Sequence, residues 1–298
     1  MTVASVFMDL CDEVRAHCAR IAAGARWVRI EPEAPVEPGG VAGLDPALHL
    51  LDAAPETVAR YVLILDAINF GSGWFGTLHT AEGEDDLTTI TRRLTEHARA
   101  AGEPWTAAQL RTLDAAQVAD VLGQDPAHEL MALYAGALVA LGDWLGARGA
   151  LEAVAAEGGG SAARLAAALA AGMPFFADHG FYKRAQITAN DLALAGVAAF
   201  GDVDRLTIFA DNLVPHVLRV DGMLPYAPEL VAKVDAGEEL AAGSEMETEL
   251  RACAVHACEL LAARWGVAPR LLDNWLWNRG QHAPYTDSPP HRTRTVFY

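Results

Sequence analysis

The chain of 298 residues is 52% hydrophobic and 20% charged, so it can bury a large core and its composition excludes a disordered protein. Its formal net charge of −17 argues against long nucleic acids and anionic membranes as partners, because Lys and Arg supply most of the binding to both. A small anionic ligand stays possible, since one local group of cations can hold it.

Helical periodicity begins near the N-terminus and dominates the chain. Apolar residues recur at spacings of three and four, with Gly24 and Gly266 as stops and Thr106 as an N-cap. Asp125 and Pro126 form the favoured pair of cap and first turn. In chain order, the predicted helices lie within residues 5–28, 57–70, 86–102, 106–123, 125–149, 161–172 and 246–266.

Strand patterns are weak and confined to residues 26–32 and 293–298, and either could be extended loop. We therefore predict an all-α fold with little or no sheet. Residues 157–161, EGGGS, are either a turn between two packed helices or a connection between two lobes. Because no fixed-period repeat is present, we expect one α-helical domain over residues 1–298.

The longest apolar runs stop short of the roughly 18 residues of a membrane span, and the N-terminus has no basic segment before its apolar residues. We expect neither a signal peptide nor a membrane partner, and a cytoplasmic location. The four cysteines are Cys11, Cys18, Cys253 and Cys258. With His256, the last two could suggest metal ligands, but they do not share a helix face, which favours ordinary buried thiols.

The first candidate for chemistry is Asp211, in the apolar run 207–218. On a helix it would share a side with Thr207, Ile208, Val214, Pro215 and Leu218, and the proline would force a kink or a stop. One interpretation is an N-cap or a hydrogen-bonded structural acid. The other is a functional acid whose pKa and access to water are set by an apolar cleft.

Lys183 and Arg184 lie beside Phe181 and Tyr182, in a chain with few cations. Adjacent cations could hold a phosphate, with an aromatic ring nearby for stacking. The alternative is a surface pair at the start of a helix.

Residues 65–75 start as a buried helix and end in a glycine-broken loop. Asp66 and Asn69 would lie one turn apart, followed by Phe70 and Trp74. Aromatic rings beside an amide and a carboxylate suit a planar heterocycle, because rings stack on its faces and polar groups contact its edge. The alternative is a helix C-cap with the aromatic rings in the core.

The last third of the chain holds further candidates. Glu247 and Arg251 are four residues apart and could be an exposed ion pair, whereas Glu249 lies close to an apolar stripe and could point inward. Trp275 and Trp277 could belong to the core or to a pocket wall. Arg292 and Tyr298 could belong to a cation cluster or to an exposed tail. No Gly-rich phosphate loop, GxSxG or HExxH motif is present, and nothing predicts a metal or an organic cofactor.

Six segments, in this order, resemble the queuosine salvage proteins, the queuosine 5′-phosphate N-glycosylase/hydrolase family. They are LDAINF (65–70), FYKRAQI (181–187), LTIFAD with the following VP (206–215), ETELRA (247–252), LDNWLWNRG (272–280) and HRTRTVFY (291–298). Residues 14–34 are similar to the family's opening helix and loop, so the likeness covers nearly the whole chain.

The resemblance implies an α-helical fold related to helix-hairpin-helix DNA glycosylases. It also implies hydrolysis of queuosine 5′-monophosphate to queuine and ribose 5-phosphate. The family's key aspartate falls on Asp211 and its FYKRAQ lysine on Lys183. A carboxylate beneath the ribose C1′ would stabilise the positive charge that develops there and position water. Which of Asp66, Asn69 and Glu249 would contact the departing 7-deazaguanine base is left open.

The sequence departs from the family pattern at Asn212 and Leu213, where an aromatic and a basic residue are usual, and at His216, where a glutamine is usual. These departures favour the alternative of a non-catalytic binder of a 7-deazaguanine nucleotide or base. A helical interaction scaffold is a third interpretation. The charge of −17 suits a free nucleotide better than a duplex with a flipped base. We expect a monomer.

Overall fold

The computed structural model describes residues 8–37, 39–40 and 43–298, and these residues fold into α-helices joined by loops and short 3₁₀ turns. The thirteen α-helices within the described residues are α1 (Leu10–Gly24), α2 (Pro55–Ala67), α3 (Asp86–Ala101), α4 (Ala107–Leu110), α5 (Ala115–Leu122), α6 (Glu129–Leu145), α7 (Ala150–Gly158), α8 (Ala162–Gly172), α9 (Lys183–Leu194), α10 (Leu213–Val220), α11 (Pro228–Asp235), α12 (Glu245–Trp265) and α13 (Pro269–Gly280). The predicted all-α class is confirmed.

Local sequence explains several helix ends. The side chains of Asp9, Asp85 and Ser161 each accept a hydrogen bond from the main-chain N–H three residues later, at the starts of α1, α3 and α8. Gly266 ends α12 with a left-handed φ of 65°, as its position in the sequence predicts.

Two predicted helix boundaries are wrong. Residues 106–123 form two helices, because Asp114 caps the separate helix α5 by accepting from Gln117 N–H at 2.9 Å. Helix α6 starts at Glu129 with His128 as its N-cap, so Asp125 and Pro126 lie in a turn before it. For the helix predicted within residues 5–28, residues 5–7 lie outside the described residues, and α1 starts at Leu10.

The two strand candidates are extended loops, as the alternative interpretation held. Val28 and Tyr226 form an isolated bridge, as do Glu239 and Arg292, and the described residues contain no sheet. Among the described residues, no single helix has the length and apolar character to cross a membrane, although α6 and α7, bent by 74°, meet that test as a pair.

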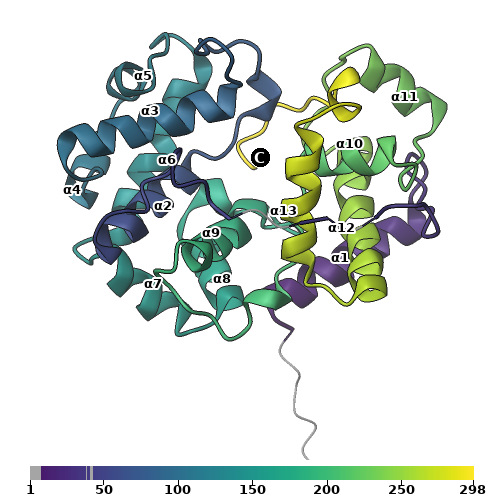
Figure 1. Cartoon of the computed structure of the whole chain (residues 1–298), viewed down its shortest axis with the longest axis horizontal. Helices are drawn as coiled ribbons and strands as arrows, with labels where there is room; N and C mark the ends of the chain where they lie inside the picture. Colours follow the sequence, from purple (N-terminus) through teal and green to yellow (C-terminus); the bar gives the residue numbers. More distant parts are fainter. Residues whose placement is uncertain (1–7, 38, 41–42) are drawn as a thin grey trace, which may run out of the picture.

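The helices form two groups in Figure 1, with α2 to α9 on one side and α1 with α10 to α13 on the other. Helix α1 packs along α12, and α8 packs on α9. Of residues 157–161, the first two end α7 and the other three form the turn to α8, and the two helices pack against each other. The four cysteines are buried free thiols, and burial raises the pKa of Cys253 to about 12.

The C-terminal segment runs back between the two groups of helices (Figure 1). It packs on the loop after α2, where Gly71 N–H donates to the Tyr298 carbonyl at 3.0 Å and Arg292 Nε donates to the Gly73 carbonyl at 2.7 Å. Gly71 has a φ of 117°, which other residues rarely adopt, and a Cβ on Gly73 would lie 2.2 Å from the Thr293 carbonyl oxygen. Glycine at both positions therefore lets the loop and the C-terminal segment meet.

Candidate active site

A cavity of about 200 Å³, called here the Asp211 cavity, is lined by residues from both groups of helices. Six of its lining residues are candidates from the sequence: Asn69, Phe70, Lys183, Asp211, Trp277 and Tyr298. The other lining residues are Ser72, Phe75, Asp85, Asp86, Leu87, Asn212, Leu213, Gln281 and Pro290. The cavity thus combines one cation, several acids and aromatic rings.

A larger groove of about 750 Å³ lies between α1, residues 25–32, residues 225–228 and α12. The described residues that line it include His256 and Arg26 but no carboxylate and none of the candidates. Acid–base chemistry therefore points to the smaller cavity.

Asp211 ends residues 206–211, which form neither helix nor strand, so the expectation that it lies within a helix is wrong. Its Oδ1 accepts hydrogen bonds from Leu213 N–H at 2.9 Å and Val214 N–H at 3.0 Å, so it caps α10. Pro215 is the third residue of α10, where an N–H has no partner within the helix, so the proline causes no kink. Asp211 as a residue is 8% exposed and lines the cavity, and its carboxylate is held through Oδ1.

Lys183 is the first residue of α9 and follows Tyr182, which has a left-handed φ of 51°. Lys183 is 5% exposed and lines the cavity. Burial lowers the pKa of its ammonium, and the nearby Asp211 carboxylate acts in the opposite direction. Within the described part of the chain, the ammonium makes no hydrogen bond or salt bridge, so a ligand anion in the cavity could bind it.

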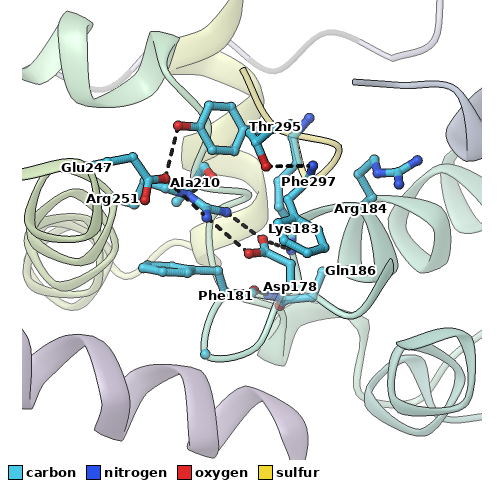
Figure 2. Close-up of polar contacts among 12 residues, drawn as sticks. Asp178, Phe181, Lys183, Arg184, Gln186, Ala210, Glu247, Arg251, Thr295 and Phe297 are labelled. Carbon is cyan, nitrogen blue, oxygen red and sulfur yellow. Dashed lines mark hydrogen bonds and ion pairs between the residues drawn. The ribbon is translucent and has the colours of Figure 1, made fainter. Parts of the chain in front are cut away.

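Arg184 does not join Lys183 in the cavity. Its guanidinium donates to the carbonyls of Asp66, Ala67 and Phe175 and stacks on Phe70, with 4.5 Å to the ring centroid. Figure 2 shows it extending away from the cluster of Arg251 and Asp178. Burial lowers its pKa to about 9. Arg184 therefore ties α9 to the end of α2. It neither lines the cavity beside Lys183 nor lies on the surface, so both interpretations considered for Arg184 are wrong.

Asp66 is buried and lies outside the cavity lining. Burial raises its pKa far above the usual range, and the nearby Asp191 carboxylate raises it further. Burial also raises the pKa of Asp191 to about 6. The raised pKa of Asp66 favours its protonated form, whereas a pKa of about 6 leaves Asp191 mostly ionised at pH 7.

Arg251 and Glu247 are buried, at 3% exposure each, so the exposed ion pair considered for them is wrong. Arg251 Nη1 lies 3.6 Å from Glu247 Oε1, and neither residue lines the cavity. Glu247 also accepts from the Tyr298 hydroxyl at 3.0 Å. Glu249 points inward, as one interpretation held, but it accepts main-chain N–H groups of residues 26–28.

The other candidates also lie outside the cavity lining, each with a protein partner. Three of them donate hydrogen bonds: Trp74 to Glu129 at 2.7 Å, Tyr182 to Glu13 at 3.0 Å and Arg292 to the Gly73 carbonyl. His216 contacts the Tyr285 carbonyl at 2.8 Å, and Trp275 packs on Trp265. The departure from the family pattern at His216 therefore does not alter the cavity wall. Among the described residues, no three side chains of His, Cys, Asp or Glu converge as a metal site.

Asp273 is a buried acid near Asp211 that is not among the candidates from the sequence. The signal for it is a single acid among the apolar residues Leu271, Leu272 and Leu276. Its Oδ1 accepts from Phe209 N–H at 2.8 Å, two residues before Asp211. Burial raises the pKa of Asp273 to about 8, with a further contribution from the Asp211 carboxylate. Asp273 therefore holds the segment that carries Asp211 and keeps its proton near neutral pH.

The raised pKa of Asp273 predicts a pH-dependent stability. Between its ordinary pKa of 3.8 and about 8, the unfolded chain releases this proton while the folded protein keeps it, so the free energy of unfolding falls as the pH rises. Asparagine can still accept from Phe209 N–H but does not ionise. The measurement is the Tm of Asp273→Asn and of wild type in thermal melts from pH 5 to 9. We expect the difference in Tm, variant minus wild type, to increase up to about pH 8 and then to level off.

The matched control for this prediction is Asp114→Asn, which makes the same chemical change at an exposed helix cap. A difference for Asp273→Asn that stays flat from pH 5 to 9 would show that Asp273 titrates normally.

The chain is similar to known proteins over most of its length. The family model described as queuosine salvage protein matches residues 48–298. The queuosine 5′-phosphate N-glycosylase/hydrolase of Sphaerobacter thermophilus is 34% identical over 274 residues, 84% of each chain. The proteins of the same name from Dictyostelium discoideum and Mus musculus are 40% and 35% identical over 134 and 136 residues, 40% of each chain.

Proposed function

The chain belongs to the queuosine salvage protein family, and we propose that it hydrolyses the N-glycosidic bond of queuosine 5′-monophosphate to release queuine and ribose 5-phosphate. The observation that carries this proposal is one cavity lined by both Asp211 and Lys183, with Phe70, Trp277 and Tyr298 around them. Relatives named as N-glycosylase/hydrolases favour an enzyme over a non-catalytic binder.

In the proposed reaction, the bond between C1′ and the base nitrogen breaks with its electron pair going to the base. Positive charge then builds up on C1′ and O4′, and the fixed Asp211 carboxylate stabilises it. Asp211 accepts a proton from the attacking water, whose oxygen bonds to C1′. The departing base takes up one proton from solvent and Asp211 gives the proton it accepted back to solvent, so substrate and water together give queuine and ribose 5-phosphate.

We assign the phosphate to Lys183, because Arg184 and Arg292 donate to main-chain carbonyls outside the cavity. For the edge of the base, Asn69 is the one residue of the three considered that lines the cavity. Queuine also carries a secondary amine that is normally cationic. Asp85 and Asp86 at the cavity suit that charge, and guanosine 5′-monophosphate lacks it.

The net charge of −17 supports a free nucleotide as substrate and argues against a nucleic acid polymer. Four buried free thiols support the proposed cytoplasmic location. That the protein acts as a monomer stays a prediction.

Incubation of the purified protein with queuosine 5′-monophosphate, queuosine and guanosine 5′-monophosphate tests the proposal, with free base followed by mass spectrometry. We expect queuine from the first substrate and no guanine from the third. A ligand-induced rise in Tm without any release of queuine over hours would favour the binder. Guanine release at a similar rate would contradict the proposed selectivity.

A further inference from the structure

Arg251 is a buried cation that the reaction above does not use. Its Nε donates to the Ala210 carbonyl at 2.9 Å, and its Nη1 and Nη2 donate to the two carboxylate oxygens of Asp178 at 3.1 and 2.5 Å (Figure 2). The guanidinium lies between two rings, 4.0 Å from the centroid of Phe181 and 4.6 Å from that of Tyr298. Its donors are thus directed at protein groups and not at the cavity.

The two hydrogen-bonded partners of Arg251, Ala210 and Asp178, each lead to a residue that lines the Asp211 cavity. Ala210 immediately precedes Asp211 in the chain. Asp178 Oδ2 also accepts from the main-chain N–H of Lys183 at 3.3 Å, and the Asp178 carbonyl accepts from Tyr182 N–H at 2.7 Å. One guanidinium therefore holds the main chain next to the carboxylate and, through Asp178, the turn that starts α9 at Lys183.

We infer that Arg251 is a positioning residue that fixes the Asp211 carboxylate and the Lys183 ammonium relative to each other across the cavity. This inference rests on the proposed function for its catalytic consequence. The planar guanidinium presents donors in a fixed fork, so it serves the carboxylate and the carbonyl at the same time. A lysine ammonium is a compact charge on a flexible stem and cannot reproduce this geometry.

The test is Arg251→Lys, which keeps the charge and loses the fork. We expect kcat for queuine release from queuosine 5′-monophosphate to fall about 100-fold, because a displacement near 1 Å at the reacting groups has an effect of that order. Arg264→Lys is the matched control, since Arg264 lies on the same helix and donates to the Pro32 carbonyl at 2.8 Å, outside the cavity. Its kcat should equal that of wild type.

Asp178→Asn is a milder second variant, which leaves Lys183 N–H an acceptor and weakens the contact with Arg251. Because both variants act through one contact, the loss of kcat in the double variant should be close to that of Arg251→Lys alone. A merely structural role would lower the Tm of both variants and leave kcat of the folded protein unchanged. That result, or additive losses, would overturn the inference.

A crystal structure of whichever variant folds gives a readout that does not depend on activity. We expect displacement of residues 210–211 and of Lys183, with the packing of α1 on α12 unchanged. If wild type releases no queuine, the proposed function fails, yet such a displacement would still support the positioning role. Unchanged positions of Asp211 and Lys183 would overturn that role even if wild type is active.

Discussion

Asp211→Asn should lower the rate of queuine release by about 10³-fold or more while the protein stays folded. The neutral amide cannot stabilise the positive charge on C1′ and O4′ or take the proton of water, and loss of one such electrostatic contribution costs about that factor. The fold should persist, because asparagine is as good an N-cap as aspartate and can accept from Leu213 N–H and Val214 N–H.

The measurement is single-turnover release of queuine from queuosine 5′-monophosphate, with thermal melts of the same samples. Asp114→Asn is again the matched control, since it makes the same chemical change at an exposed cap of α5. Near-normal turnover by Asp211→Asn would remove Asp211 from the mechanism. A large fall in Tm alongside the loss of activity would indicate that its role as a cap dominates.

Lys183→Met should weaken recognition of the 5′-phosphate. Charge-assisted hydrogen bonds contribute about 1.5–3 kcal/mol, so kcat/KM for queuosine 5′-monophosphate should fall about 10- to 100-fold. For the nucleoside queuosine, which has no phosphate, kcat/KM should change little. The comparison of the two substrates with both proteins isolates the contact, because any general disturbance of the cavity would lower both rates.

Stability provides the second readout for Lys183→Met. Burial lowers the pKa of Lys183, so the folded protein bears a desolvation cost for its charge that methionine does not have. We therefore expect a Tm equal to or above that of wild type. An equal loss of kcat/KM for nucleoside and nucleotide would contradict the assignment of Lys183 to the phosphate and favour a role at the ribose or at Asp211.

The sequence by itself determined the all-α class, because helix periodicity and caps are local. Asp9, Asp85 and Ser161 cap helices with an N–H only three residues away. Asp211 was recognisable for a similar reason, since an acid in an apolar run is visible without knowledge of the fold. The geometry confirms the capping interpretation, because Asp211 accepts the first N–H groups of α10, and it also places Asp211 in the cavity lining, while its catalytic role stays a proposal.

Only the tertiary structure decided which candidates share the cavity. Adjacent residues of an α-helix point about 100° apart, so Lys183 faces the cavity while Arg184 turns to carbonyls of α2 and of residue 175. Glu249 finds its partners in residues 26–28, and Arg251 finds its partner in Asp178, 73 residues away. Such partners meet only when the helices pack against each other. The spacing of residues along the chain does not show which distant group will pair with a given buried charge.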